Sequence, residues 1–233
     1  MRSGDTSRAP HQVALDAALD AATVWMSLHQ PPGAHKLRMT PPRIYLVRHG
    51  ETAWSLSGQH TGRTDIPITP KGEQDAASLR GPLAALHVEA VYTSPLQRAR
   101  RTGELAGFES MQVIDDLIEW DYGDYDGLTT PQIHTRKPGW NLFRDGGPGG
   151  ESPQEVSDRA DRVIARLRAG AGNALIFSHG HFLRSLAARW IGLPISAGRS
   201  LILSPATLSI LSYDHNRADE PAIELWNSET QKR

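Results

Sequence analysis

The 233-residue sequence contains no cysteine. This absence excludes disulfides, thiolate nucleophiles and cysteine-ligated metal sites, and it suits a reducing compartment, so we expect a cytoplasmic protein. No stretch approaches the ~18 apolar residues of a membrane span, and the N-terminus lacks the apolar core of a secretory signal. The formal net charge is only −1. Without a global field that attracts nucleic acid or anionic lipid, any anion site must be built locally.

Residues 1–42 differ in character from the rest of the chain. Proline clusters interrupt this segment in the manner of a linker. We expect an N-terminal extension over 1–42 and one compact domain over 43–233. Residues 13–28 could form an amphipathic helix that docks on the domain. Alternatively the extension is flexible and Met39 is the natural start; the sequence leaves these alternatives open.

From residue 43 onward, apolar runs alternate with helix signals. Strands are predicted over 43–47, 90–93, 112–114, 173–177, 207–213 and 222–226. Helices are predicted over 69–86, 95–106, 152–169 and 181–191. A loop-rich section lies between residue 120 and the third of these helices. Repeated strand–helix units predict an α/β fold in three layers, with a mainly parallel central sheet and helices on both faces.

Two histidines occupy matching places in this scheme. His49 follows the first predicted strand, and His179 follows the strand over 173–177. Because ligands of open α/β sheets bind beyond the carboxyl ends of the strands, both imidazoles should face one crevice. Arg48 adjoins the first histidine, and Arg98 opens a helix after another strand end, where a helix N-terminus favours anions. The pattern predicts an anion site at this edge of the sheet.

The chemistry of these side chains points to phosphoryl transfer. Guanidinium groups match phosphate oxygens in geometry and charge, and a neutral imidazole is a competent nucleophile. Positioning and charge stabilisation are the main requirements, so we expect no metal or other cofactor. A proton donor is still needed, and a partly buried carboxylic acid can hold its proton near neutrality. Glu119 is the candidate; Asp121, Asp124 and Glu151 are its rivals.

Four motifs at these positions resemble the histidine phosphatase superfamily, which includes cofactor-dependent phosphoglycerate mutases and many acid and sugar phosphatases. They are Arg48-His49-Gly50-Glu51-Thr52, Ser94-Pro95-Leu96-Gln97-Arg98-Ala99, Glu119 with Gly123 and Gly127, and Ser178-His179-Gly180. The resemblance covers roughly residues 43–226 in the family's order. It implies a phosphoglycerate mutase-like fold.

The resemblance also implies a role for each residue. His49 would be the phosphorylated nucleophile and Glu119 the proton donor. Arg48, Arg98 and His179 would bind the phosphoryl group. Substrate contacts would come from Ser55, Thr61, Gly62, Tyr122, Gly180 and His181.

Departures from the mutase pattern favour hydrolysis. Mutases carry a long, basic insertion after the donor glutamate, whereas the segment between Glu119 and Glu151 is short and lacks paired arginines. Ser55 and His181 stand where mutases have asparagine. A short lid admits water, so we predict a phosphomonoesterase that hydrolyses small phosphorylated metabolites through a phosphohistidine. A phosphoglycerate mutase and an inactive module that binds phospho-ligands are the alternatives. The sequence is especially similar to small actinobacterial acid phosphatases and also resembles fungal sedoheptulose-bisphosphatase relatives, so the substrate stays open.

Other interpretations of these motifs are weaker. His179 and His181 could be read as a metal pair, but no carboxylate motif completes it, and no metal is expected. The glycines of 146–150 lack nucleotide-loop spacing and suggest a flexible lid edge. The expected partner is therefore a small phosphorylated substrate, without nucleic acid or membrane. A homo-oligomer remains open, because the sequence does not reveal oligomeric state.

Overall fold

The computed structural model describes residues 41–229. The predicted extension over 1–42, with its helix and Met39, lies almost wholly outside these residues, so the domain boundary stays a prediction. Over residues 41–229, no helix combines the length and apolar character that crossing a membrane requires.

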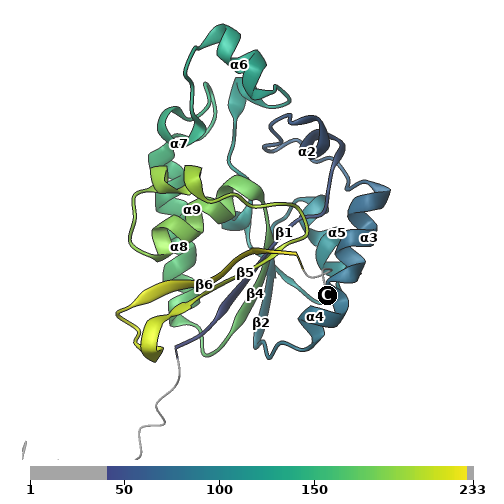
Figure 1. Ribbon diagram of the computed structural model, residues 1–233, viewed down its shortest axis with the longest axis vertical. Helices are drawn as coiled ribbons and strands as arrows, with labels where there is room; N and C mark the ends of the chain where they lie inside the picture. Colours follow the sequence, from purple (N-terminus) through teal and green to yellow (C-terminus); the bar gives the residue numbers. More distant parts are fainter. Residues whose placement is uncertain (1–40, 230–233) are drawn as a thin grey trace, which may run out of the picture. The chain divides into compact units, whose positions relative to one another are not determined.

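A single sheet organises the described residues (Figure 1). Its strand order is β3-β2-β4-β1-β5-β6. The strands are β1 (Ile44–Arg48), β2 (Ala90–Thr93), β3 (Gln112–Val113), β4 (Ala174–Ser178), β5 (Leu208–Tyr213) and β6 (Pro221–Ser228). The first four pair in parallel, whereas β5 runs antiparallel to β1, and β6 antiparallel to β5. The predicted mainly parallel sheet is confirmed.

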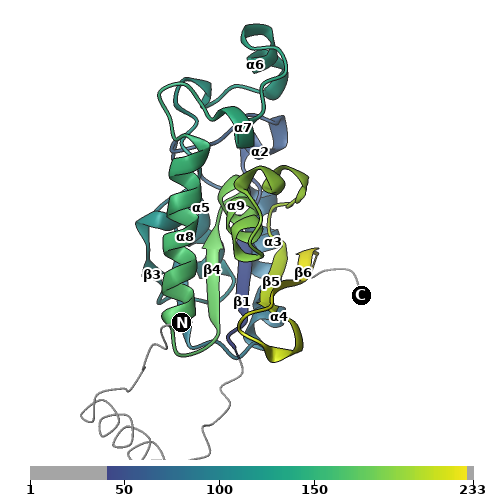
Figure 2. The ribbon, with the colours of Figure 1, turned by 90° about the vertical axis from the view of Figure 1, so that its left-hand side faces the viewer.

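Helices cover both faces of the sheet, as predicted (Figures 1 and 2). On β1, Ile44 and Leu46 face a core shared with α8 and α9, while Tyr45 and Val47 face the core beneath α3 and α4. This alternation follows from the two-residue period of a strand. The helices are α2 (Ala53–Ser57), α3 (Pro70–Ser78), α4 (Arg80–Ala84), α5 (Gln97–Leu105), α6 (Thr130–Arg136), α7 (Leu142–Asp145), α8 (Pro153–Ala169) and α9 (Gly180–Trp190). Short 3₁₀ turns are η1 (Asp115–Leu117), η2 (Gly123–Tyr125), η3 (Ile195–Ser200) and η4 (Asp214–Asn216).

The predicted helix over 69–86 is wrong as one element. Thr69 caps α3, but this helix ends at Ser78 and α4 restarts at Arg80. Pro82 has no N–H to donate to the carbonyl four residues earlier, so a continuous helix would lose a hydrogen bond there. Proline is accepted in the first turn of a new helix instead.

The section that was predicted as loops contains α6 and α7. Thr129 forms a capping box with Gln132 at α6, and the Asn141 side chain accepts from Phe143 N at α7. Both helices lie beyond the carboxyl ends of β1 and β4 (Figures 1 and 2). Ser152 and Glu155 form a capping box at the start of α8. The section therefore stands over the edge where ligands are expected.

Candidate active site

His49 and His179 come together because their strands are neighbours. Arg48 pairs with Ser178 at the ends of β1 and β4, and His49 N donates to Ser178 O at 2.9 Å. The two imidazole centroids lie 5.2 Å apart. His49 is 4% exposed and His179 is fully buried. Two residues far apart in the sequence thus form one buried pair at the carboxyl edge of the sheet.

The surroundings of His49 hold its imidazole neutral. Nδ1 lies 2.7 Å from Gly50 O, so Nδ1 carries the proton and the lone pair of Nε2 is left for chemistry. Burial lowers the pKa of His49 well below its ordinary value, and Arg98 and Arg48 lower it further. A Cβ on Gly50 would lie 2.6 Å from Gly72 O. Glycine is therefore required next to this histidine.

His179 is fixed by groups from the next strand. Arg98 Nε donates to its Nδ1 at 3.1 Å, so the proton lies on Nε2, which is 2.7 Å from Ser94 Oγ at the end of β2. Burial lowers the pKa of His179 well below its ordinary value, followed by the charge of Arg98. Both ring nitrogens are thus engaged by protein groups. Ser94, which belongs to a recognised motif, was not predicted as a site residue.

Arg98 connects α5 to the segment that contains Thr61 and Gly62. Its guanidinium is fully buried and donates to Thr64 O at 2.9 Å and to Gly62 O at 2.8 Å. Asp126 accepts from Gly62 N at 2.8 Å on the other side of this segment. Thr61 O lies 3.4 Å from Arg98 Nη2. The arginine therefore positions His179 and the segment that contains two of the predicted substrate contacts.

Arg48 presents a donor without a protein partner. Its Nη1 donates to Leu203 O, but its buried Nε has no hydrogen-bond partner among the described residues. Buried polar groups are nearly always paired, so an orphaned guanidinium N–H beside two histidines suits an anion. Gly180 allows the close packing, since a Cβ there would lie 3.2 Å from Arg48 Cζ and Nε.

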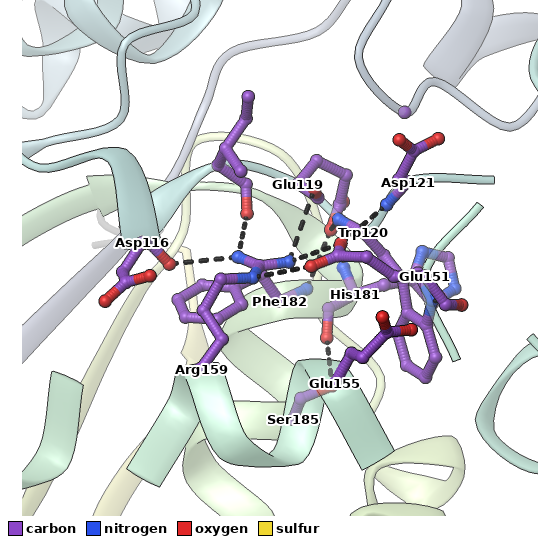
Figure 3. Close-up of polar contacts among 12 residues, drawn as sticks. Asp116, Glu119, Trp120, Asp121, Glu151, Glu155, Arg159, His181, Phe182 and Ser185 are labelled. Carbon is purple, nitrogen blue, oxygen red and sulfur yellow. Dashed lines mark hydrogen bonds and ion pairs between the residues drawn. The ribbon is translucent and has the colours of Figure 1, made fainter. Parts of the chain in front are cut away.

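Glu119 caps the helix that follows His179. The side chain is 3% exposed. Oε1 accepts from Trp120 N and Phe182 N at 2.8 Å each, and Oε2 accepts from His181 N at 3.0 Å. The last two donors belong to the first turn of α9. Figure 3 shows Glu119 together with Trp120, His181 and Phe182, whose N–H groups it binds.

The rival carboxylates are occupied elsewhere or exposed. Asp121 pairs with Arg63 at 3.1 Å. Glu151 pairs with the buried Arg159 at 2.8 Å. Asp124 is exposed. The glutamate that caps α9 remains the candidate donor.

The predicted substrate contacts fall into two groups. Ser55 makes local bonds only, since it forms a capping box with Thr52 at the start of α2. Tyr122 and His181 instead form a hydrogen-bonded pair through the phenol oxygen and Nδ1. Burial raises the pKa of Tyr122 and lowers that of His181 well below its ordinary value. Tyr122 and His181 therefore supply neutral polar atoms next to the segment that contains Glu119.

His60, which sequence reasoning did not single out as a site residue, joins this neutral group. Its ring stacks on Tyr122 with centroids 4.9 Å apart and an interplanar angle of 28°. Trp140 contacts it edge-on at 5.4 Å. Burial lowers the pKa of His60 to about 4, although Asp126 opposes the shift. The only signal in the sequence was its place directly before Thr61.

A group with metal-ligand geometry lies at the other end of the sheet. Asp214, His215 and Glu220 form it, on the exposed turn between β5 and β6. Because β5 runs antiparallel to β1, this turn is remote from the end of β1 that carries His49. None of the predicted site residues belongs to it.

Comparisons with known proteins show which family this chain resembles. The family model described as histidine phosphatase superfamily (branch 1) matches residues 44–229. An acid phosphatase of Mycobacterium tuberculosis is 40% identical over 177 residues, which cover 74% of this chain and 87% of that protein. Sedoheptulose 1,7-bisphosphatase of Saccharomyces cerevisiae is 34% identical over 250 residues, covering 79% and 92%. A solved structure of an M. tuberculosis open reading frame product superimposes with a TM-score of 0.77 at 38% identity, covering 81% and 98%.

Proposed function

The chain belongs to the histidine phosphatase superfamily, and on that premise we propose that it hydrolyses small phosphorylated metabolites through a phosphohistidine at His49. The predicted family, fold class and phosphatase character are confirmed by the family match and the relatives. The proposal rests chiefly on one observation. The Nδ1–H of the buried His49 donates to Gly50 O, so the lone pair of Nε2 is free to attack phosphorus. The Nε of Arg48, which has no protein partner among the described residues, is available beside it to bind the phosphoryl group.

The proposed reaction has two half-reactions. In the first, His49 Nε2 forms a bond to phosphorus while the bond to the leaving oxygen breaks, and Glu119 gives that oxygen a proton. In the second, Glu119 takes a proton from water as the water oxygen attacks the phosphohistidine and frees phosphate. Arg48 and Arg98 stabilise the charge on the equatorial oxygens.

The short segment between Glu119 and Glu151 supports hydrolysis rather than transfer between substrates. The segment after Glu119 is short, and it is packed rather than loose: a Cβ on Gly147 would lie 2.0 Å from Tyr122 O, and one on Gly150 would lie 2.2 Å from Asp121 O. We expected the glycines of 146–150 to form a flexible lid edge. Instead they pack tightly against the backbone of residues 121 and 122. Between Glu119 and Glu151 there is no long basic insertion that could bind a second anionic group.

The relatives support the substrate class. One is an acid phosphatase and another a sedoheptulose 1,7-bisphosphatase, so phosphorylated sugars and related small phosphomonoesters are the substrates that we propose to test first. The protein would act on these in the cytoplasm, without a nucleic-acid or membrane partner.

A phosphoenzyme assay tests the proposal. Wild-type protein should release p-nitrophenol in a burst and yield an acid-labile phosphoprotein. His49→Ala should lower kcat/KM at least about 10³-fold, whereas His87→Ala, at a side chain that is 89% exposed, should have no effect. Full activity in His49→Ala would refute the proposal. Transfer to 2-phosphoglycerate or 3-phosphoglycerate with added bisphosphoglycerate would identify a mutase, and binding without turnover an inactive module.

A further inference from the structure

Arg159 is a buried arginine that the proposed reaction does not use. It lies on α8 and is 5% exposed. Nε and Nη2 donate to the two oxygens of Glu151 at 2.9 and 2.8 Å, and Nη1 donates to Asp116 O at 2.9 Å and Ile118 O at 2.6 Å. The guanidinium also lies 4.4 Å from the centroid of the Phe182 ring. Figure 3 shows it at the centre of these contacts.

These contacts enclose Glu119 from both sides along the chain. The carbonyls of Asp116 and Ile118 precede the glutamate. After it, Asp121 N donates to Glu151 Oε2 at 2.9 Å, and Trp120 Nε1 donates to Glu151 O at 2.9 Å. Arg159 and its partner Glu151 therefore hold the backbone immediately before and after the donor.

A second arginine on the same helix forms an ion pair at the surface, which serves as a comparison for the Arg159 pair. Arg162 is one turn further along α8 and binds the Asp116 carboxylate at 2.8 Å, with side chains that are 59% and 35% exposed. Exposed pairs of this kind contribute little. The Arg159 pair is largely buried instead, with side chains that are 6% and 15% exposed, and burying an ion pair costs about as much free energy as the pairing returns. Stability alone gives a weak reason for placing charges there.

We propose that Arg159, together with Glu151, is a positioning residue that holds the Glu119 carboxyl group against the first turn of α9 for proton donation. This inference rests on the proposed function. When the P–O bond breaks, an alkoxide must receive a proton from Glu119, whereas p-nitrophenolate leaves without one. Loss of positioning should therefore matter only for leaving groups that need the proton.

Matched arginine-to-lysine variants test this. Lysine keeps the charge but cannot bind a carboxylate and two carbonyls with one planar fork. For Arg159→Lys we expect kcat/KM to fall about 10²-fold with glycerol phosphate and less than about threefold with p-nitrophenyl phosphate, because kcat/KM reports the steps up to release of the alcohol. Arg162→Lys should change neither value more than about twofold. Competitive inhibition by inorganic phosphate should be unchanged in both variants.

Equal losses for both substrates, or no loss, would overturn the inference. If Arg159→Lys does not fold, as judged by circular dichroism, Glu151→Gln weakens the same ion pair, and the same selective loss is expected; equal losses there would overturn it too. A wild-type protein that hydrolyses both substrates, with an inactive His49→Ala, upholds the proposed function whatever the arginine variants do. A wild-type protein that hydrolyses neither would overturn both.

Discussion

The carboxyl edge of the sheet and the 120–150 section that stands over it are built in different ways. At the edge, neighbouring parallel strands bring the ring centroids of His49 and His179 to within 5.2 Å of each other. The buried Arg98 donates hydrogen bonds both to His179 and to the backbone carbonyl of Thr64. Over it, short helices and glycine turns place Tyr122 in ring contact with His60, which belongs to the segment between α2 and α3.

The two regions also differ in charge. The edge holds the buried guanidinium of Arg98 and the half-buried Arg48, whose Nε is buried, at neutral histidines. Above the edge, the ring contact is made by neutral groups: burial raises the pKa of Tyr122 and lowers that of His60. Under the proposed function, we expect the edge to bind the phosphoryl group common to all substrates, and the neutral groups above it to distinguish the remaining parts of each substrate. The following predictions separate these roles.

The largest effect is expected at the edge, for Arg98→Met. Removing a guanidinium that stabilises phosphoryl oxygens should lower kcat/KM about 10³-fold. The carbonyls of Gly62 and Thr64 also lose their donor, so unfolding free energy should fall by about 1–3 kcal/mol. Steady-state kinetics and urea unfolding measure both. Arg100→Met, at an exposed position on the same helix, is the control, and similar losses in the two variants would contradict the assignment.

The difference between the regions also explains what the sequence could predict. His49, Arg48, Arg98 and His179 follow strand ends, and strand ends are readable because buried strands are apolar runs. Parallel pairing then brings such positions together without further information. The same reasoning predicted the sheet and the helices α5, α8 and α9, and it failed where Pro82 divides α3 from α4.

The sequence alone could not predict residues whose role depends on contacts between distant segments. Glu119 was chosen by family resemblance, because nothing local says that its carboxyl group meets the N–H groups of His181 and Phe182. Arg159 reads as one of several helix arginines until Glu151 is seen beside it. The helices α6 and α7 are too short for periodicity to show and depend on their caps.

An intermediate effect is expected where the two regions touch, for Gly62→Ala. The added Cβ would lie 2.8 Å from Tyr122 Cδ2 and 3.0 Å from Trp120 O, and overpacking of this kind costs about 1–3 kcal/mol. Because Gly62 O also accepts from Arg98, kcat/KM should fall about tenfold, a loss smaller than that of misplacing a catalytic group outright. Thermal unfolding and kinetics measure the two effects.

Gly81→Ala is the matched control for that variant. No atom lies within 4 Å of its added Cβ, and it lies within α4. Alanine is the better helix former by about 1 kcal/mol, so this variant should be at least as stable as wild type. Unchanged stability and activity in Gly62→Ala would mean that the edge and the section over it are not tightly coupled.

The smallest effect on activity is expected at His60, which packs against Tyr122 and makes stability depend on pH. Burial lowers its pKa to about 4 in the folded protein, below the ordinary value of about 6.5 in the unfolded chain. Between these values the unfolded state binds more protons, so His60 makes stability fall as pH drops from 6.5 towards 4, by at most about 3 kcal/mol. His60→Phe retains a ring for Tyr122 and removes the titration. Urea unfolding at pH 7 and pH 5 should therefore show a shallower loss for the variant than for wild type, with hydrolysis of p-nitrophenyl phosphate little changed. Equal pH slopes would show that the ring protonates freely in the folded protein, and the groups above the edge would then carry charge below neutrality.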